Sequence, residues 1–229
     1  MCGRFTLTAD GQTLQMALGL DTAPDVKPRY NIAPSQPIGV VTNENPQTLD
    51  FFNWGLVPFW ADEPKIGYKM INARSETAHE KPSFRAAFEH RRCLIPSDGF
   101  YEWQARENQK KKQPMYIFLD EHPVFAFAGL WERWESDDGS EILSCTILTT
   151  QANDKIKGVH HRMPVILQRD DYDTWLQADD QAVLRGLMRP YPDEPMAYYP
   201  VSTQVNKPAN ETPDNIVPIE DGGEQQRLF

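Results

Sequence analysis

The stretch that decides the fold runs from residue 114 to residue 149 and holds three apolar segments: Pro114-Met-Tyr-Ile-Phe-Leu119, Val124-Phe-Ala-Phe-Ala-Gly-Leu-Trp131 and Ile142-Leu-Ser-Cys-Thr-Ile-Leu-Thr149. Charged turns bound each segment, and β-branched and aromatic residues are frequent in all three. This pattern predicts three strands. Together with the segments that precede them, they indicate a sheet that is mostly antiparallel.

Two further strand pairs are expected before this stretch. Residues 38–41 and 49–57 flank the turn Asn43-Glu-Asn-Pro46, which predicts a hairpin. Arg92-Cys-Leu-Ile-Pro96 and Gly99-Phe-Tyr-Glu-Trp103 flank a Pro-Ser-Asp-Gly turn, so the same logic predicts a second hairpin there.

The expected helices are short. Leu14, Met16, Ala17 and Leu18 recur near helical spacing, and Gly19 follows them as a C-cap glycine would. Three more helices are predicted over residues 83–90, 170–177 and 180–188, with a short strand at 164–167. The 19 prolines and 11 phenylalanines argue against a helical bundle, because proline interrupts long helices and aromatics favour sheet. The sequence therefore predicts an α+β fold.

Length and composition indicate an ordinary globular protein. The chain has 229 residues, of which 40% are hydrophobic and 24% charged. No run approaches the roughly 18 apolar residues of a membrane span, and the first residues lack the apolar segment of a signal peptide. We expect a cytoplasmic protein with no membrane contact, a single domain over residues 1–220 and a disordered tail at 221–229.

The formal charge of −10 argues, taken alone, against a nucleic-acid-binding protein. Residues 57–112 differ from this average, because they contain 11 Lys/Arg against 8 Asp/Glu. Any anionic ligand is therefore expected to bind along this middle stretch. Cys2, Cys93 and Cys145 have no spacing typical of a zinc site or redox pair, so we expect no disulfide, metal or cofactor.

Cys2 is the most unusual residue. Methionine aminopeptidases remove Met1 when the second residue is small, which would leave Cys2 at the N-terminus. An N-terminal cysteine carries an α-amine of pKa about 7.7–8.0 beside a thiol of pKa about 8.5. This pair suits aldehydes, because the amine forms an imine and the thiol then closes a five-membered thiazolidine. The alternative is that a cysteine at position 2 is accidental.

Three other polar stretches are candidates for chemistry, each with a simpler explanation. Asn72-Ala-Arg-Ser-Glu76 follows apolar residues and either faces a cleft or caps a helix. Glu102 alternates with Tyr101 and Trp103, so it either faces solvent or is a buried general acid with a raised pKa. The pair His160-His161 offers proton transfer or, less consistently with its spacing, a metal site.

Six strings in the chain together resemble the SOS response-associated peptidase (SRAP) family. They are Met1-Cys-Gly-Arg-Phe5, Arg29-Tyr-Asn-Ile-Ala-Pro34, Trp54-Gly-Leu-Val-Pro-Phe-Trp60, Ile71-Asn-Ala-Arg-Ser-Glu76, Gly99-Phe-Tyr-Glu-Trp103 and His160-His-Arg-Met-Pro164. Each string alone is weak, but six in order at compatible spacing are specific, and the resemblance covers the chain from Cys2 to about Ile219. The resemblance implies sheets curved into a barrel-like core, and a sensor that covalently traps abasic sites in single-stranded DNA.

The resemblance also implies roles for individual residues. Cys2 matches the nucleophile, Asn72 the amide that orients it, Glu102 the acid/base and His160 a second proton-transfer group. The positions that match DNA-binding residues are Arg4, Asn31, Pro34, Trp60, Arg74, Thr149 and Arg162. One position departs from the family pattern, because the residue after the motif histidine is often acidic and is His161 here.

Two other functions compete with DNA trapping. The first is a thiol peptidase in which Cys2 attacks a peptide carbonyl and His160 is its base; autoproteolysis and strand cleavage by a lyase step are compatible with the same residues. The second is a non-catalytic nucleic-acid-binding or nucleotide-binding module. On the main hypothesis the partner is single-stranded DNA with abasic sites, and the protein acts as a monomer associated with the nucleoid.

Overall fold

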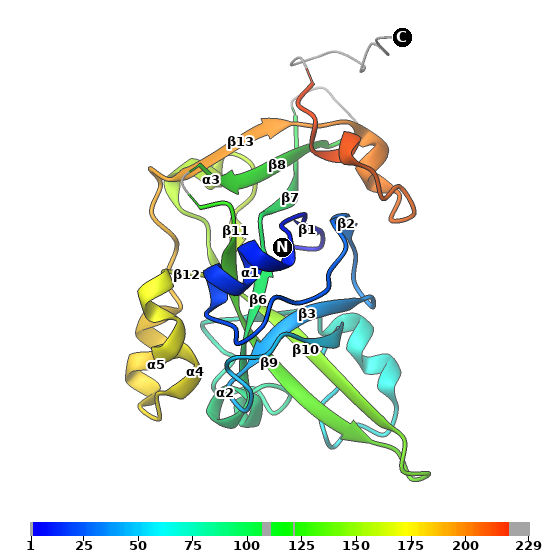
Figure 1. Cartoon of the computed structure of the whole chain (residues 1–229), viewed down its shortest axis with the longest axis vertical. Helices are drawn as coiled ribbons and strands as arrows, with labels where there is room; N and C mark the ends of the chain where they lie inside the picture. Colours follow the sequence, from blue (N-terminus) through cyan, green and yellow to red (C-terminus); the bar gives the residue numbers. More distant parts are fainter. Residues whose placement is uncertain (1, 107–110, 121, 220–229) are drawn as a thin grey trace.

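The computed structural model describes residues 2–106, 111–120 and 122–219, and it contains two sheets (Figure 1). The smaller sheet has five antiparallel strands in the order β13-β8-β7-β1-β2. Their bounds are Met196–Pro200 for β13, Gln113–Leu119 for β8, Gly99–Gln104 for β7, Phe5–Leu7 for β1 and Arg29–Ile32 for β2. In Figure 1, β13 and β8 lie at the top and β1 near the centre.

The larger sheet closes on itself. Its path runs β10-β4-β3-β6-β9, and β9 pairs again with β10, so these five strands form a barrel. The bounds are Glu141–Gln151 for β10, Asp50–Trp54 for β4, Pro37–Thr42 for β3, Arg92–Ser97 for β6 and Phe125–Glu135 for β9. All neighbours are antiparallel except β10 and β4. The predicted α+β class with mostly antiparallel, barrel-like sheets is confirmed.

Three short strands extend the barrel. Strand β5 (Asn72–Arg74) pairs in parallel with β10, β11 (Arg162–Pro164) pairs antiparallel with β10, and β12 (Ile166–Leu167) pairs with β9. The predicted strand at 164–167 is thus divided between two partners. Val165 lies at the division, where its N–H donates to the carbonyl of Leu148 at 2.8 Å.

Short helices cover the outside of the sheets. Helix α1 begins after Asp10, whose side chain accepts from the N–H of Thr13, and ends at Gly19 with φ 69°. The helix bounds are Gly11–Leu18 for α1, Arg85–His90 for α2, Asp154–Lys157 for α3, Tyr172–Gln177 for α4 and Gln181–Leu187 for α5. The 3₁₀ turns are Pro64–Lys69 (η1), Arg169–Asp171 (η2), Thr203–Asn206 (η3) and Pro213–Ile216 (η4). Within the described residues, no helix is long and apolar enough to cross a bilayer.

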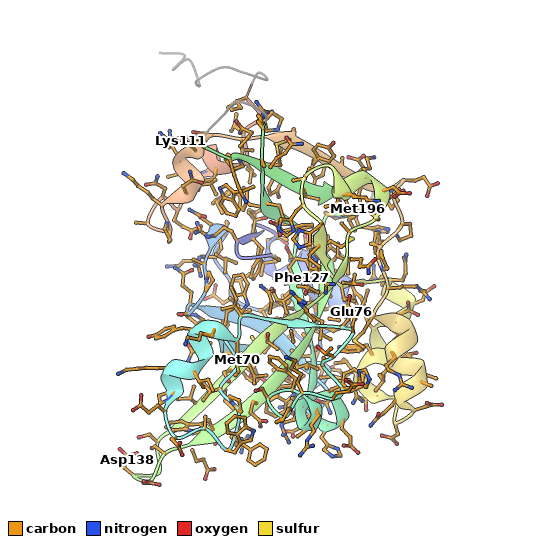
Figure 2. The ribbon with its side chains drawn as sticks, turned by 180° about the vertical axis from the view of Figure 1, so that it is seen from behind. Met70, Glu76, Lys111, Phe127, Asp138 and Met196 are labelled. Carbon is orange, nitrogen blue, oxygen red and sulfur yellow. The ribbon has the colours of Figure 1, made fainter. Side chains whose placement is uncertain are left out.

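Phe5 of β1 joins the two sheets. Its ring makes edge-on contacts with Trp54, centroids 5.2 Å apart, and with Phe127, centroids 5.8 Å apart. All three side chains are buried, and Figure 2 labels Phe127 near the middle of the molecule. Such edge-to-face pairs add about 0.5–1.5 kcal/mol each beyond the area they bury. Phe5 therefore holds the first strand of the smaller sheet against the barrel core.

The predicted hairpin between residues 92–96 and 99–103 is wrong. Strand β6 pairs with β3 and β9, whereas β7 pairs with β1 and β8, so the chain changes sheets at Asp98. The Asp98 carboxylate accepts hydrogen bonds from the backbone and hydroxyl of Thr8 and from the hydroxyl of Thr6. These bonds draw the turn toward β1 and direct β7 away from β6.

The sequence did not predict β1, β2, β5 or β13, which are only three to five residues long. Nor did it predict the segment 203–217, named here the C-terminal strap, in which η4 packs beside β2 and η3 beside β8. The expected disordered tail at 221–229 lies outside the described residues, and the single domain over residues 1–220 stays a prediction.

A tight contact at Gly99, where the chain enters the smaller sheet, gives a prediction about stability. A Cβ at Gly99 would lie 2.2 Å from the hydroxyl oxygen of Tyr116 and 2.3 Å from its Cζ, at the first residue of β7. We expect Gly99→Ala to lower the free energy of unfolding by about 1–3 kcal/mol, measured by urea denaturation.

Gly186→Ala is the matched control. A Cβ at Gly186 meets nothing within 4 Å and lies inside helix α5, where alanine is the better helix former. This variant should be neutral or more stable by about 0.5–1 kcal/mol. Equal losses in the two variants would contradict the assigned constraint at Gly99.

Candidate active site

Cys2 lies three residues before the start of β1 and is completely buried. Its carbonyl oxygen accepts a hydrogen bond from Nδ2 of Asn72 at 2.7 Å, and its thiol lies 4.0 Å from the carbonyl of Arg4. Burial raises the pKa of the Cys2 thiol, and the negative charge of Glu102 raises it further. The thiol is therefore held in its protonated form, close to a carboxyl group.

Glu102 lies on β7, the strand beside β1. The N–H of Tyr101 donates to the carbonyl of Arg4 at 2.9 Å, so the pairing of the two strands continues toward Cys2. Glu102 is only 3% exposed, and this burial raises its pKa. The alternative that Glu102 faces solvent is wrong. A carboxyl group with a raised pKa is suited to donating a proton near neutral pH.

Asn72 reaches Cys2 from the barrel. It begins β5, which is held by the parallel pairing of Asn72 with Ile147 on β10. The alternative that Asn72 caps a helix is wrong, because the next helix, α2, has Phe84 at its N-cap position. Oδ1 of Asn72 is buried and meets no hydrogen-bond donor among the described residues.

His160 lies on the loop that follows α3. Nε2 of Gln104, two residues beyond Glu102, donates to the carbonyl of Gly158 at 3.0 Å, which ties this loop to the end of β7. Nδ1 of His160 accepts from the N–H of Arg162 at 3.1 Å. Burial lowers the pKa of His160, which favours a neutral imidazole able to accept a proton.

His161 differs from its neighbour in exposure. The two rings stack with centroids 4.4 Å apart, but His161 is exposed whereas His160 is half-buried. Repulsion between the two rings when both are protonated is the main cause that lowers the pKa of His161. Across the described part of the chain, no three His, Cys, Asp or Glu side chains gather into a group that could hold a metal ion.

Arg74, Thr149 and Arg162 come together on three adjacent strands. Arg74 and Thr149 are partners across β5 and β10, and Arg162 pairs with Gln151 on the other side of β10. Arg162 is 8% exposed and donates to the carbonyl of Thr149 at 2.6 Å and to its hydroxyl at 3.3 Å. Its remaining partner is Glu76, whose two carboxylate oxygens lie 2.5 and 3.0 Å from Nη1 and Nη2. Arg74 is exposed.

Arg4 and Asn31 are buried beneath the C-terminal strap. Nη1 of Arg4 donates to Oδ1 of Asn31 and to the carbonyl of Val205, each at 2.7 Å. The amide of Asn31 donates in turn to the carbonyls of Lys207 at 3.0 Å and Asn210 at 2.8 Å. The predicted DNA-binding side chain of Asn31 thus holds the strap in this structure.

Trp60 and Pro34 are more exposed than Arg4 and Asn31. Trp60 is 47% exposed, and its Nε1 donates to the carbonyl of Pro82 at 3.4 Å. Pro34 is half-buried and precedes Ser35, a non-glycine residue with a φ of 69°. A cavity of about 280 Å³ adjoins this turn, lined by Ser35, Asn53, Trp54, Gly55, Val57, Pro64, Lys65, Gly67, Tyr68 and Ile142.

Two acidic residues take part in these contacts, although the sequence had indicated no role for them. Glu76 belongs to the quoted 71–76 string, and its place two positions after Arg74 was a usable signal that it lies near the site. Glu211 of the strap accepts from the backbone of Tyr30 and Asn31 and pairs with Arg29 at 3.2 Å. No local sequence pattern indicated that pairing, because about 180 residues separate the partners.

The chain is similar to known proteins over nearly its whole length. Residues 1–208 match the family model described as SOS response associated peptidase (SRAP). The abasic site processing protein YoqW of Bacillus subtilis is 44% identical over 222 residues, which cover 94% of this chain and 99% of that relative. The abasic site processing protein HMCES of Xenopus tropicalis is 33% identical over 225 residues, covering 84% and 67% of the two chains.

Solved structures share the fold. A crystal structure of a protein from Bacteroides thetaiotaomicron superposes with a TM-score of 0.85 at 27% identity, covering 95% of this chain and all of that one. A second, from Bordetella bronchiseptica, has a TM-score of 0.77 at 26% identity, covering 88% of this chain and all of that one.

The buried carboxyl of Glu102 gives a pH-dependent prediction. A raised pKa in the folded state means that ionising Glu102 costs folding free energy. This penalty is absent below the unfolded-state pKa of about 4.3, grows as pH rises to the folded-state pKa and is complete above it. We therefore expect Glu102→Gln to be more stable than the unmodified protein at pH 8 and similar to it at pH 4, by urea denaturation.

Glu44→Gln is the control, because Glu44 is exposed and the same substitution removes one charge there. It should change stability by less than about 0.5 kcal/mol at both pH values. A stability gain for Glu102→Gln that is the same at pH 4 and pH 8 would contradict a burial-raised pKa.

Proposed function

Since the chain belongs to the SRAP family, we propose that it processes abasic sites in single-stranded DNA by forming a covalent crosslink through Cys2. Relatives named abasic site processing proteins support the substrate. The observation that carries the chemistry is the meeting of three groups at the start of β1: the Cys2 thiol, the Asn72 amide on the Cys2 carbonyl, and the buried Glu102 carboxyl.

The proposed reaction begins with removal of Met1, which frees the α-amine of Cys2. An abasic deoxyribose opens to an aldehyde at C1′, and the amine attacks that carbon. Loss of water gives an imine, and the thiol sulfur then adds to the imine carbon while the thiol proton passes to the nitrogen. The product is a thiazolidine that joins Cys2 to the DNA strand.

Glu102 and His160 are proposed to move protons in this sequence. A protonated Glu102 donates to the ring oxygen of the sugar as the ring opens, which its burial-raised pKa favours. A neutral His160 accepts a proton from the amine, which its lowered pKa favours. Asn72 acts as a positioning residue, because its amide fixes the Cys2 carbonyl and so orients the amine and thiol.

The DNA strand is proposed to run past β5, β10 and β11. Arg74 is exposed and available to a phosphate, and Arg162 and Thr149 lie on the strands beside it. Trp60, 47% exposed, can stack on a base next to the lesion, and Pro34 lies in a surface turn. Arg4 and Asn31 are proposed to act indirectly, by holding the strap in place through their hydrogen bonds to Val205 and Lys207.

A thiol peptidase and a non-catalytic nucleic-acid-binding module are the competing functions. The experiment that separates them is incubation with an oligonucleotide containing one abasic site, followed by a denaturing gel. Trapping gives a covalent band with the abasic strand and none with an undamaged strand. A peptidase or a binding module gives no such band, and that result would overturn the proposal.

The thiol of Cys2 gives the first functional prediction. Cys2→Ala keeps an N-terminal amine but cannot close the thiazolidine ring, so we expect heat-stable crosslinks to disappear. The imine should still form, and borohydride reduction should trap it as a covalent band. Undiminished heat-stable crosslinking by Cys2→Ala, measured on a denaturing gel, would contradict thiazolidine formation.

The two adjacent histidines give the second functional prediction. His160→Gln should slow crosslinking by about 10²-fold or more, the usual effect of losing acid/base catalysis, with affinity for an undamaged strand nearly unchanged. His161→Gln is the matched control, since His161 is the exposed neighbour, and its rate should stay within about twofold. The opposite order of the two rates would assign the proton transfer to His161.

A further inference from the structure

The carboxylate of Glu76 forms an ion pair with the guanidinium of Arg162. The carboxylate makes a two-point contact, with oxygens 2.5 and 3.0 Å from Nη1 and Nη2. Bidentate contacts of this kind are among the stronger ion pairs, because both partners are planar and matched in spacing. Figure 2 labels Glu76 near the middle of the molecule, on the side of helices α4 and α5.

The other donors of Arg162 are directed inward. Nη2 also donates to the Thr149 carbonyl and hydroxyl, and Nε is buried with no acceptor among the described residues. The Arg162 hydrogen bond holds the pKa of Glu76 below its ordinary value, so the carboxylate is charged at neutral pH. An approaching phosphate therefore meets a neutralised ion pair at Arg162 and not a bare positive charge.

Glu76 has room to leave this contact. Its side chain is 44% exposed, whereas that of Arg162 is 10% exposed. Glu76 also lines a cavity of about 410 Å³, together with Ser75, His79, Thr150, Gln151, Arg185, Met188 and Pro190. Hydroxyl, amide, imidazole and guanidinium groups in this lining offer donors to a carboxylate that turns away from Arg162.

We propose that Glu76 is an electrostatic gate on DNA binding: its carboxylate holds Arg162 in the DNA-free protein, and a strand phosphate binds Arg162 only by displacing it toward this cavity. The gate rests on the proposed function, since it concerns the binding of the same single-stranded DNA. Binding at Arg162 is then an exchange of one anion for another, which gains less free energy than neutralising a bare cation. Undamaged strands are held weakly, and retention depends on the covalent step at Cys2.

The test is the affinity of Glu76→Gln for an undamaged single-stranded oligonucleotide, measured by fluorescence anisotropy between 50 and 300 mM salt. Glutamine keeps the shape of Glu76 but removes its charge, so we expect binding about fivefold tighter at the lowest salt. The slope of log affinity against log salt should steepen by about 0.7, as for one more neutralised phosphate on a single strand.

Glu80→Gln is the matched control, because Glu80 is an exposed carboxylate four residues away that contacts His79 and not Arg162. It removes the same charge nearby and should change affinity by less than twofold. In an Arg162→Gln background, Glu76→Gln should no longer tighten binding, since the gated cation is gone.

Two results would overturn the gate. The first is unchanged or weaker binding by Glu76→Gln, which would make Glu76 a support for Arg162. The second is equal tightening by Glu76→Gln and Glu80→Gln, or tightening that persists without Arg162, which would make the effect a general one of net charge. Failure of the unmodified protein to bind any single strand would instead overturn the proposed function itself.

Discussion

The contact of Phe5 with Trp54 and Phe127 is the interaction on which the rest of the structure depends. Strand β1 has only three residues and pairs on both sides, with β2 and β7, so hydrogen bonding alone fixes it weakly. The buried Phe5 ring sets its depth against the barrel. Because Cys2 lies three residues before Phe5, the position of this ring also determines where the thiol meets Asn72 and Glu102.

Burial gives the polar residues of the site their chemical character. A carboxyl at 3% exposure is harder to ionise than one in water, and a half-buried imidazole is harder to protonate, so Glu102 and His160 shift in opposite senses. Two groups with such shifts form a proton donor and a proton acceptor at the same pH. The buried arginines show the cost of the same environment, since Arg4 and Arg162 each need several carbonyl or carboxylate partners.

The sequence predicted what local patterns determine. The apolar runs gave β8, β9 and β10, and Gly19 marked the C-terminal end of α1. It could not predict the change of sheet at Asp98, because the turn resembles that of a hairpin and the deciding bonds come from Thr6 and Thr8, about 90 residues away in sequence. Motifs located Cys2, Asn72 and Glu102, but alternation could not decide whether Glu102 is buried, since Tyr101 on the opposite face is also fully buried.

The ion pair between Glu76 and Arg162 bears on how a chain with a net charge of −10 can hold a polyanion. Long-range attraction favours any nucleic acid and is strongest for duplex, which carries the higher charge density. An acidic surface removes that general attraction, and an arginine already paired with a carboxylate removes part of the local one. On the proposed function, what remains is short-range: phosphate contacts that exchange with existing partners, and one aldehyde that reacts with Cys2. Selectivity for a damaged strand then comes from the covalent step, because neither charge nor base contacts distinguish it from an intact one.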